Sequence, residues 1–217
     1  MVVDFMLRTQ RKKSMSKYFG QWDTDRVIES YFPGQVNGRC VEVGAYDGIK
    51  GSNSKYFEDL GWETTCIEPN PFIYHELLKN RNGRCLNIAV GSHVGISDFK
   101  VYDFKSGIQS SLSSLDTDPR LIEEYGDAIE KTTYVEVPVF LLGTIVNLNN
   151  IDFISIDTEG TEYDVLLGCH LYRQTPKLLV VENNYEDECI TSYVRHYGYK
   201  LDQRYKVNDF YLRGDLC

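Results

Sequence analysis

The chain has 217 residues, of which 42% are hydrophobic and 13% aromatic, so it can bury one substantial hydrophobic core. This length fits a single α/β domain over residues 1–217, with an N-terminal arm and helix over 1–37 and the core over 38–217. A net charge of −9 argues against DNA or RNA as a partner, because nucleic-acid binding depends on Lys and Arg side chains that displace counterions.

The cysteines and the hydropathy of the sequence both bear on the compartment in which the protein is expected. The six cysteines form no Cys-x-x-Cys pair, and several lie in or beside predicted central strands, where bridges between neighbouring parallel strands are rarely possible. We therefore expect reduced thiols and a cytoplasmic protein. No apolar run reaches membrane-spanning length, so no membrane partner is expected. Residues 1–17 carry five Lys or Arg, which a solvated terminus explains more simply than a basic arm that binds an acidic partner.

Residues 18–32 carry an apolar stripe that predicts a helix, ended by Pro33 and Gly34. The sequence CVEVGAYDGIKGSN over 40–53 then predicts a buried strand that runs into a glycine-rich turn. Gly44 and Gly48 would let a ligand approach the backbone. Glu42, at the end of this strand, is costly to bury unless a ligand amine or a ring of backbone amides donates hydrogen bonds to it.

The spacing of this turn separates two nucleotide-like ligands. A dinucleotide fingerprint requires G-x-G-x-x-G, whereas this chain has acid-x-Gly-Ala-x-x-Gly. Glu42 would repel a pyrophosphate but would suit the amine and sulfonium of S-adenosylmethionine. The plain alternative is a strand-to-helix turn without a ligand.

The second strand is predicted over 62–68, after a short helix that Gly61 ends. Asn70 is a good N-cap for a helix over 72–80, and the third strand follows over 84–90. Glu68 ends the second strand 20 residues beyond Gly48, near the offset at which such folds place an acid on the ribose hydroxyls. A helix-capping acid is the alternative.

Residues 91–150 give weaker patterns. We expect strands over 96–102 and 134–139, a helix over 121–130, and a serine-rich loop over 106–114 that is more simply solvated than ligand-binding.

The last third of the chain repeats the arrangement of acids at strand ends. Strands are predicted over 151–157 and 178–182, ending in Asp157 and Glu182, with a helix over 162–167 between them. Because ligands bind outside the carboxyl ends of parallel strands, these two acids, Glu42 and Glu68 all face one crevice. A helix over 191–196 and a strand pair over 199–204 and 208–213 make the last strand antiparallel, a layout typical of methyltransferases rather than dehydrogenases.

Over residues 18–213 the chain resembles the FkbM family of S-adenosylmethionine-dependent methyltransferases. The matching segments are VEVGAYDGIKGSNS (41–54), Gly61-Trp62, IEPNP (67–71), NIAVG (87–91), IDFISIDTEGTEYDVLLG (151–168), VVEN (180–183), and GY with NDFYLR (198–213). Glu42 replaces the usual Asp, and residues 92–150 match poorly. The resemblance implies a class I methyltransferase fold, which is α/β and Rossmann-like. Its seven-stranded sheet is mostly parallel, with an antiparallel C-terminal strand and helices on both faces.

The resemblance also implies S-adenosylmethionine as cofactor and a hydroxyl acceptor on a small molecule or glycan, often a sugar. The expected cofactor-binding residues are Glu42, Gly44, Ala45, Gly48, Ser52, Asn53, Glu68, Pro69 and Asn70. A base must take the acceptor proton, and Asp157 and Glu182 are its candidates. Glu159 and Glu162 rank lower because both are expected to enter the following helix. None of the four histidines is expected near the strand ends.

A metal site is an equal alternative to a lone base. Asp157, Glu182 and Asn183 would offer Mg²⁺ or Mn²⁺ an all-oxygen site that bridges to the acceptor hydroxyl. Two other functions remain open at this point, a nicotinamide-dependent oxidoreductase and a non-catalytic nucleoside-binding module. The sequence leaves the identity of the acceptor and the oligomeric state open.

Overall fold

The computed structural model describes residues 18–105 and 113–214. The basic stretch over 1–17 and most of the serine-rich loop, residues 106–112, therefore lie outside the described residues. Within the described ranges, no helix combines the length and apolar character needed to cross a bilayer. The five cysteines in these ranges are free; Cys40, Cys66 and Cys169 are buried, and Cys189 is exposed.

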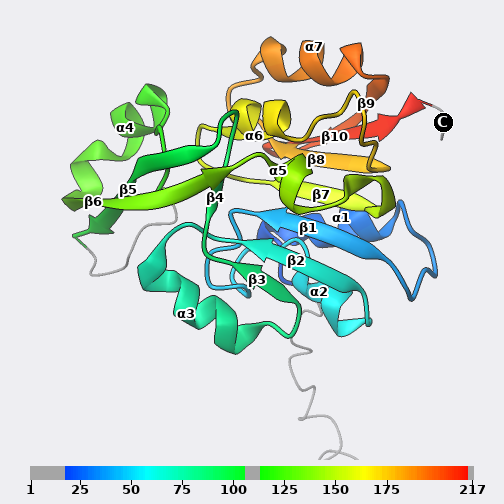
Figure 1. Ribbon diagram of the computed structural model, residues 1–217, viewed down its shortest axis with the longest axis horizontal. Coiled ribbons are helices and arrows are strands. Elements are labelled where there is room, and N and C mark those ends of the chain that lie inside the picture. Colours follow the sequence, from blue (N-terminus) through cyan, green and yellow to red (C-terminus); the bar gives the residue numbers. More distant parts are fainter. Residues whose placement is uncertain (1–17, 106–112, 215–217) are drawn as a thin grey trace, which may run out of the picture.

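A seven-stranded sheet with strand order β3-β2-β1-β7-β8-β10-β9 forms the centre of the fold (Figure 1). Its strands are β1 (Arg39–Val43), β2 (Glu63–Ile67), β3 (Arg84–Leu86), β7 (Phe153–Ile156), β8 (Leu178–Glu182), β9 (Tyr199–Tyr205) and β10 (Asn208–Arg213). The strand β10 pairs antiparallel with β8 and with β9, and the other pairings are parallel. The mostly parallel sheet with an antiparallel final strand is confirmed.

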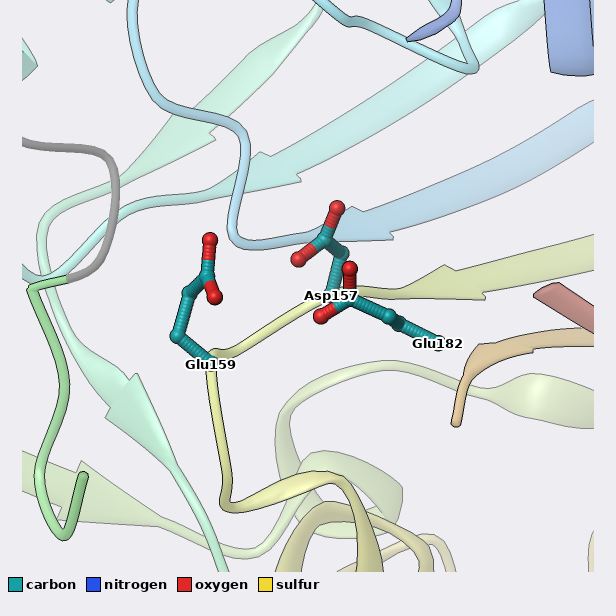
Figure 2. Close-up of side chains that lie close together, drawn as sticks. All are labelled: Asp157, Glu159 and Glu182. Atoms are coloured by element: carbon teal, nitrogen blue, oxygen red, sulfur yellow. The ribbon is translucent and has the colours of Figure 1, made fainter. Parts of the chain in front are cut away.

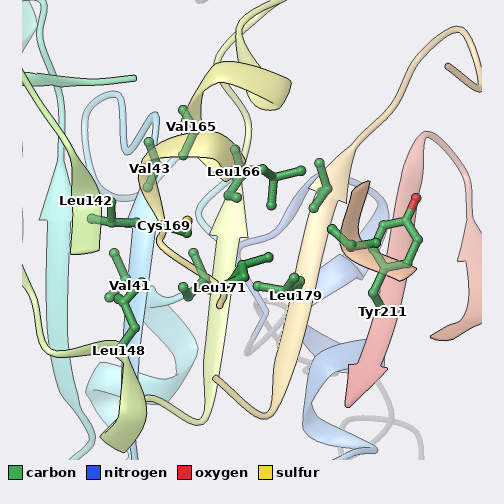
Figure 3. Packing of buried hydrophobic residues seen from close by; sticks show 14 of the residues in the cluster. Val41, Val43, Leu142, Leu148, Val165, Leu166, Cys169, Leu171, Leu179 and Tyr211 are labelled. Atoms are coloured by element: carbon green, nitrogen blue, oxygen red, sulfur yellow. The ribbon is translucent and has the colours of Figure 1, made fainter. Parts of the chain in front are cut away.

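Helices cover both faces of this sheet because its central strands are apolar on both sides. The helices α1 (Thr24–Glu29), α2 (Lys55–Asp59) and α3 (Pro71–Asn80) lie on one face, and α5 (Leu142–Ile145), α6 (Glu162–Gly168) and α7 (Glu188–His196) on the other. Phe153 packs with the first group, whereas Val41, Val165 and Leu179 belong to the cluster under the second group (Figure 3). This alternation confirms the expected layers.

The first helix is shorter than predicted. The segment over 18–32 contains a 3-10 turn, η1 (Gln21–Asp23), and then α1. Trp22 and Asp23 have φ values of 56° and 60°, which break the helix that the apolar stripe predicted. The break places Gln21 and Trp22 beside a cavity at the carboxyl ends of the main strands.

A second, three-stranded sheet occupies the region whose patterns were weak. It consists of β4 (Ala89–Val90), β5 (Gly95–Phe104) and β6 (Ile129–Phe140) in the order β4-β6-β5, with α4 (Pro119–Tyr125) and η2 (Gly126–Ala128) between β5 and β6. A further 3-10 turn, η3 (Leu148–Asn150), precedes β7. In Figure 1 this sheet extends beside the carboxyl ends of the main strands.

Two sequence-based boundaries are corrected here. The predicted strand over 84–90 is divided between two sheets, because the Asn87 amide nitrogen donates to the carbonyls of Glu68 (2.8 Å) and Pro69 (3.1 Å) at the break. The helix predicted over 121–130 ends at Tyr125, and β6 already begins at Ile129.

Candidate active site

A cavity of about 840 Å³ lies at the carboxyl ends of β1, β2, β7 and β8, closed on one side by the second sheet and α4. This volume is within the range of small-ligand sites. Most of the predicted cofactor residues and both predicted catalytic acids line it: Glu42, Gly44, Ala45, Ser52, Glu68, Pro69, Asn70, Asp157 and Glu182. The prediction that the acids at the strand ends share one crevice is therefore confirmed.

The turn after β1 depends on Gly44. Its φ is +84°, and a Cβ built there would lie 1.7 Å from the carbonyl oxygen of Asp157. The backbone nitrogens of Gly44 and Ala45 both donate to the Ile67 carbonyl at 3.0 Å. Only glycine allows the ends of β1 and β7 to approach so closely while the turn stays fixed to β2.

Two predicted cofactor residues lie behind the cavity wall rather than in it. A Cβ on Gly48 would lie 2.6 Å from Leu77 Cδ1, so this glycine allows α3 to pack against the turn. The Asn53 backbone nitrogen donates to Glu42 at 2.6 Å, and its side-chain nitrogen donates to Ser155 Oγ at 2.9 Å. Gly48 and Asn53 therefore shape the wall, and neither lines the cavity.

Glu42 is satisfied by the protein itself. It accepts hydrogen bonds from the Ser52 hydroxyl (2.8 Å), the Asn53 backbone nitrogen (2.6 Å) and the Ser54 hydroxyl (2.6 Å). An ion pair of 3.2 Å joins it to Arg81, whose side chain is fully buried. Sequence reasoning missed Arg81, whose only signal was a charged residue directly after the predicted helix over 72–80.

Glu68 is buried at the end of β2, and both of its carboxylate oxygens are already oriented. One oxygen accepts from the Tyr46 backbone nitrogen and the other from that of Asn70, each at 2.8 Å. Burial raises the pKa of Glu68 to about 7, although these two hydrogen bonds oppose the shift. Each oxygen keeps acceptor capacity for a further donor such as a ribose hydroxyl. Asn70 caps α3 as predicted, accepting from the Phe72 nitrogen at 3.0 Å.

Three carboxyl groups converge at the ends of β7 and β8 (Figure 2). Asp157, Glu159 and Glu182 offer oxygens that all lie within 4.8 Å of one another. Burial raises the pKa of each, and the negative charges of neighbouring carboxylates raise it further. Three carboxyl groups this close together are more stable when they share protons or bind a cation than when each carries a negative charge.

Glu159 does not lie where the sequence predicted it. It does not enter the helix; it lies in the preceding turn with φ of 59°, and its side chain points toward Asp157 and Glu182. Glu162, by contrast, begins α6 and binds the turn, accepting from the backbone nitrogens of Thr158 (2.8 Å) and Gly160 (3.1 Å). The helix-start interpretation therefore fits Glu162 and is wrong for Glu159.

Asn183 does not join this carboxylate group. Its side-chain oxygen accepts from the Asp187 backbone nitrogen at 2.7 Å, and its side-chain nitrogen donates to Asp209 at 2.8 Å. The residue lines a smaller neighbouring cavity and not the main one. The prediction that Asn183 lies with Asp157 and Glu182 is therefore wrong, and the third side chain beside those two acids is Glu159.

The opposite wall comes from segments whose role the sequence did not indicate. This wall is built by the second sheet, the segment before α4, α4 itself, the N-terminal turn and the loop after β8. Its residues are Trp22, Phe99, Phe104, Leu115, Leu121, Glu124, Tyr125 and Tyr185. Ser113 lines the cavity, and the buried Ser114 donates to the Thr158 carbonyl at 3.0 Å. As expected, His75, His93, His170 and His196 do not line it.

The strand order, the antiparallel β10 between β8 and β9, and the cavity at the strand ends define a class I methyltransferase fold. The sequence matches the model of the Methyltransferase FkbM domain over residues 42–201, and the chain belongs to this family of S-adenosylmethionine-dependent methyltransferases. This membership sets aside the nicotinamide-dependent alternative.

Solved structures with similar folds are distant in sequence. A fibrillarin/Nop5p complex matches with 12% identity and a TM-score of 0.44, over 87% of this chain and 80% of that chain. A precorrin-6y C5,15-methyltransferase from Geobacter metallireducens matches with 12% identity and a TM-score of 0.45, over 93% of this chain and 90% of that chain. No curated protein matches the sequence significantly.

Proposed function

We propose that this protein transfers a methyl group from S-adenosylmethionine to a hydroxyl group of a sugar or glycan. The observation that carries the proposal is the group of three carboxylates, Asp157, Glu159 and Glu182, in the wall of the cavity that the predicted cofactor residues also line. Bound S-adenosylmethionine supplies an electrophilic methyl group on a positively charged sulfur. The family membership supports the cofactor, and the carboxylates support a hydroxyl acceptor.

The residues present fit this cofactor. Gly44 and Ala45 carry no side chain larger than a methyl group where the turn lines the cavity, so a ligand can lie close to the backbone there. Glu68 keeps acceptor capacity on both oxygens while two backbone amides hold it in place, which suits a pair of ribose hydroxyls. Ser52, Pro69 and Asn70 complete the part of the wall that we assign to cofactor binding.

The carboxylates would act on the acceptor. A hydroxyl attacked on a methyl group must lose its proton, and a carboxylate whose pKa is raised toward neutral pH accepts a proton more effectively than an ordinary one. Asp157, with its pKa raised by burial, is the base that we favour, and Glu182 and Glu159 orient it. The protonation of one neighbour reduces the repulsion within the group.

The same three carboxylates fit a divalent cation. Mg²⁺ and Mn²⁺ prefer oxygen ligands, and a bound cation would lower the pKa of an acceptor hydroxyl. Exhaustive chelation separates the two mechanisms. Full activity after chelation, with Asp157→Ala inactive, would exclude the cation and retain the base; loss of activity that Mg²⁺ or Mn²⁺ restores would favour the cation.

Calorimetry tests the cofactor. We expect binding of S-adenosylmethionine or S-adenosylhomocysteine and not of NAD, and a loss of on the order of tenfold in affinity for Glu68→Ala, because a charge-assisted hydrogen bond contributes about 1.5 to 3 kcal/mol. Glu63→Ala is the matched control, since Glu63 lies on the same strand but is exposed and outside the cavity. Tighter binding of NAD would contradict the proposal.

Labelled S-adenosylmethionine tests the acceptor. We expect the label on carbohydrate hydroxyls after incubation with candidate glycans, and no label when Asp157→Ala is used. A non-catalytic binding module would transfer no label in either case. Label on nucleic acid or protein, with none on carbohydrate, would contradict the sugar acceptor.

A further inference from the structure

The described cavity wall carries an excess of negative charge. Lys50 is the only Lys or Arg on the described part of this wall. Residues 106–112, with the sequence SGIQSSL, contain no charged residue. The carboxylates on the wall are those of Glu42, Glu68, Glu124, Asp157, Glu159 and Glu182.

The nearest guanidinium groups do not correct this excess. Arg81 lies behind the wall and pairs with Glu42, so it neutralises one carboxylate and faces no ligand. Arg120, at the start of α4, is held by Asp118 (2.6 Å) and Asp187 (2.8 Å), and it stacks 3.8 Å from the Tyr185 ring centroid. Two carboxylates thus already balance Arg120, and it does not line the cavity.

Neither shared protons nor a metal removes the negative charge. Three carboxylates with one divalent cation, or with two shared protons, keep one negative charge at Asp157, Glu159 and Glu182. Glu124, exposed on α4, adds another at the wall opposite. The positive sulfonium and amine of the cofactor suit such a wall, whereas a second ligand that is anionic does not.

We propose that the acceptor is a neutral or amine-bearing sugar, and that the wall rejects phosphorylated, nucleotide-activated and carboxylated sugars. This inference rests on the proposed function, since it specifies the acceptor of the same site. Repulsion between one phosphate charge and one carboxylate about 6 Å away weakens binding by roughly a hundredfold at an effective dielectric constant near 20. The expected discrimination is therefore up to that order, because Lys50 and the positive charges of the cofactor offset part of the repulsion.

The rejection of nucleotide-activated sugars places methyl transfer in a sequence of reactions. A nucleotide sugar carries a diphosphate, which a glycosyl-transfer reaction releases when the sugar is joined to its acceptor. Among neutral sugars, a glycoside is the form that a nucleotide sugar yields, so we infer that a glycosyl-transfer reaction supplies the substrate and that methylation follows the formation of the glycosidic bond.

The test compares matched acceptors that carry the same sugar. We would measure kcat/KM for labelled methyl transfer by the full chain to methyl glycosides and amino-sugar glycosides, and to the corresponding sugar 1-phosphates and uridine-diphosphate sugars. Glu124→Lys should raise the relative rate with the phosphates by at least tenfold. Glu123→Lys is the control, because it makes the same charge change on the same exposed helix at a residue that does not line the cavity.

Each outcome decides between distinct claims. Transfer to the phosphorylated or nucleotide sugars as efficient as to the glycosides would overturn this inference and leave the proposed function intact. Cofactor binding without transfer to any of these sugars would overturn the sugar acceptor and this inference with it. Equal effects of Glu124→Lys and Glu123→Lys would show that net charge, rather than the cavity wall, sets the discrimination.

Discussion

Removal of the buried guanidinium of Arg81 should destabilise the fold more than the loss of any single surface charge. Arg81 forms ion pairs with Glu42 (3.2 Å) and Glu58 (3.0 Å), and its side chain is fully buried while both carboxylates are 6% exposed. Its guanidinium also donates to the hydroxyls of Ser52 (3.1 Å) and Ser54 (2.7 Å). Arg81→Leu keeps much of the side-chain volume but leaves two buried carboxylates without a cation.

The expected cost follows from this loss of compensation. Breaking one buried ion pair by removing a partner typically costs about 3 to 5 kcal/mol in the free energy of unfolding. For a chain of this length, that corresponds to a fall in Tm of roughly 6 to 20 °C. Urea unfolding followed by circular dichroism measures the change directly, and the exposed Arg84→Leu, which we expect to change stability by less than about 0.5 kcal/mol, is the control.

The acid limb of the stability curve gives a second readout. Burial opposes ionisation of Glu58, but a hydrogen bond from Thr64 and the charge of Arg81 lower its pKa to about 2. A lowered pKa gives stability that is present above the ordinary value of 4.5 and is lost as the pH falls toward 2. In Arg81→Leu this acid-induced loss should be smaller, and Glu58→Gln added to Arg81→Leu should restore part of the stability. A loss below about 1 kcal/mol in Arg81→Leu would refute the reasoning.

Two further predictions concern the turn after β1 and the acid at the end of β2. Gly44→Ala should destabilise the fold and abolish cofactor binding, because its Cβ would lie 1.7 Å from the Asp157 carbonyl. Gly34→Ala is the control, since Gly34 also has a positive φ but has nothing within 4 Å of its Cβ and does not line the cavity; it should cost only the strain of the positive φ and leave cofactor binding unchanged. Equal losses measured by calorimetry and urea unfolding would contradict this. Because the pKa of Glu68 is raised from 4.5 to about 7, the ligand-free protein should lose stability as the pH rises through this window, by up to roughly 3 kcal/mol from this group. Urea midpoints between pH 4.5 and 7 should therefore fall less in Glu68→Gln than in the wild type, and identical slopes would show that Glu68 does not titrate there.

The sequence by itself predicted the acids at the strand ends that form the site. Buried β-branched runs identified β1, β7 and β8, and the acids that follow such runs meet at one edge because parallel strands end on the same side of a sheet. The N-cap at Asn70 was also predictable, since it depends on a few neighbouring residues. These predictions succeeded because each rests on local pattern or on a general property of parallel sheets.

Other features depend on contacts between residues distant in the chain, or on the conformation of single residues. Arg81 reaches Glu42 across 39 positions, and no spacing rule marks such a pair in advance. Asn183 is drawn away from the carboxylates by Asp187 and Asp209, whereas a single positive φ turns Glu159 toward them.

The sequence thus determined which strands carry acids to the crevice. The tertiary structure decided which of those acids face the cavity and which the protein itself neutralises. A buried charge is stable only where packing brings it a partner, and this packing is set by the whole fold rather than by the residues beside it in the chain.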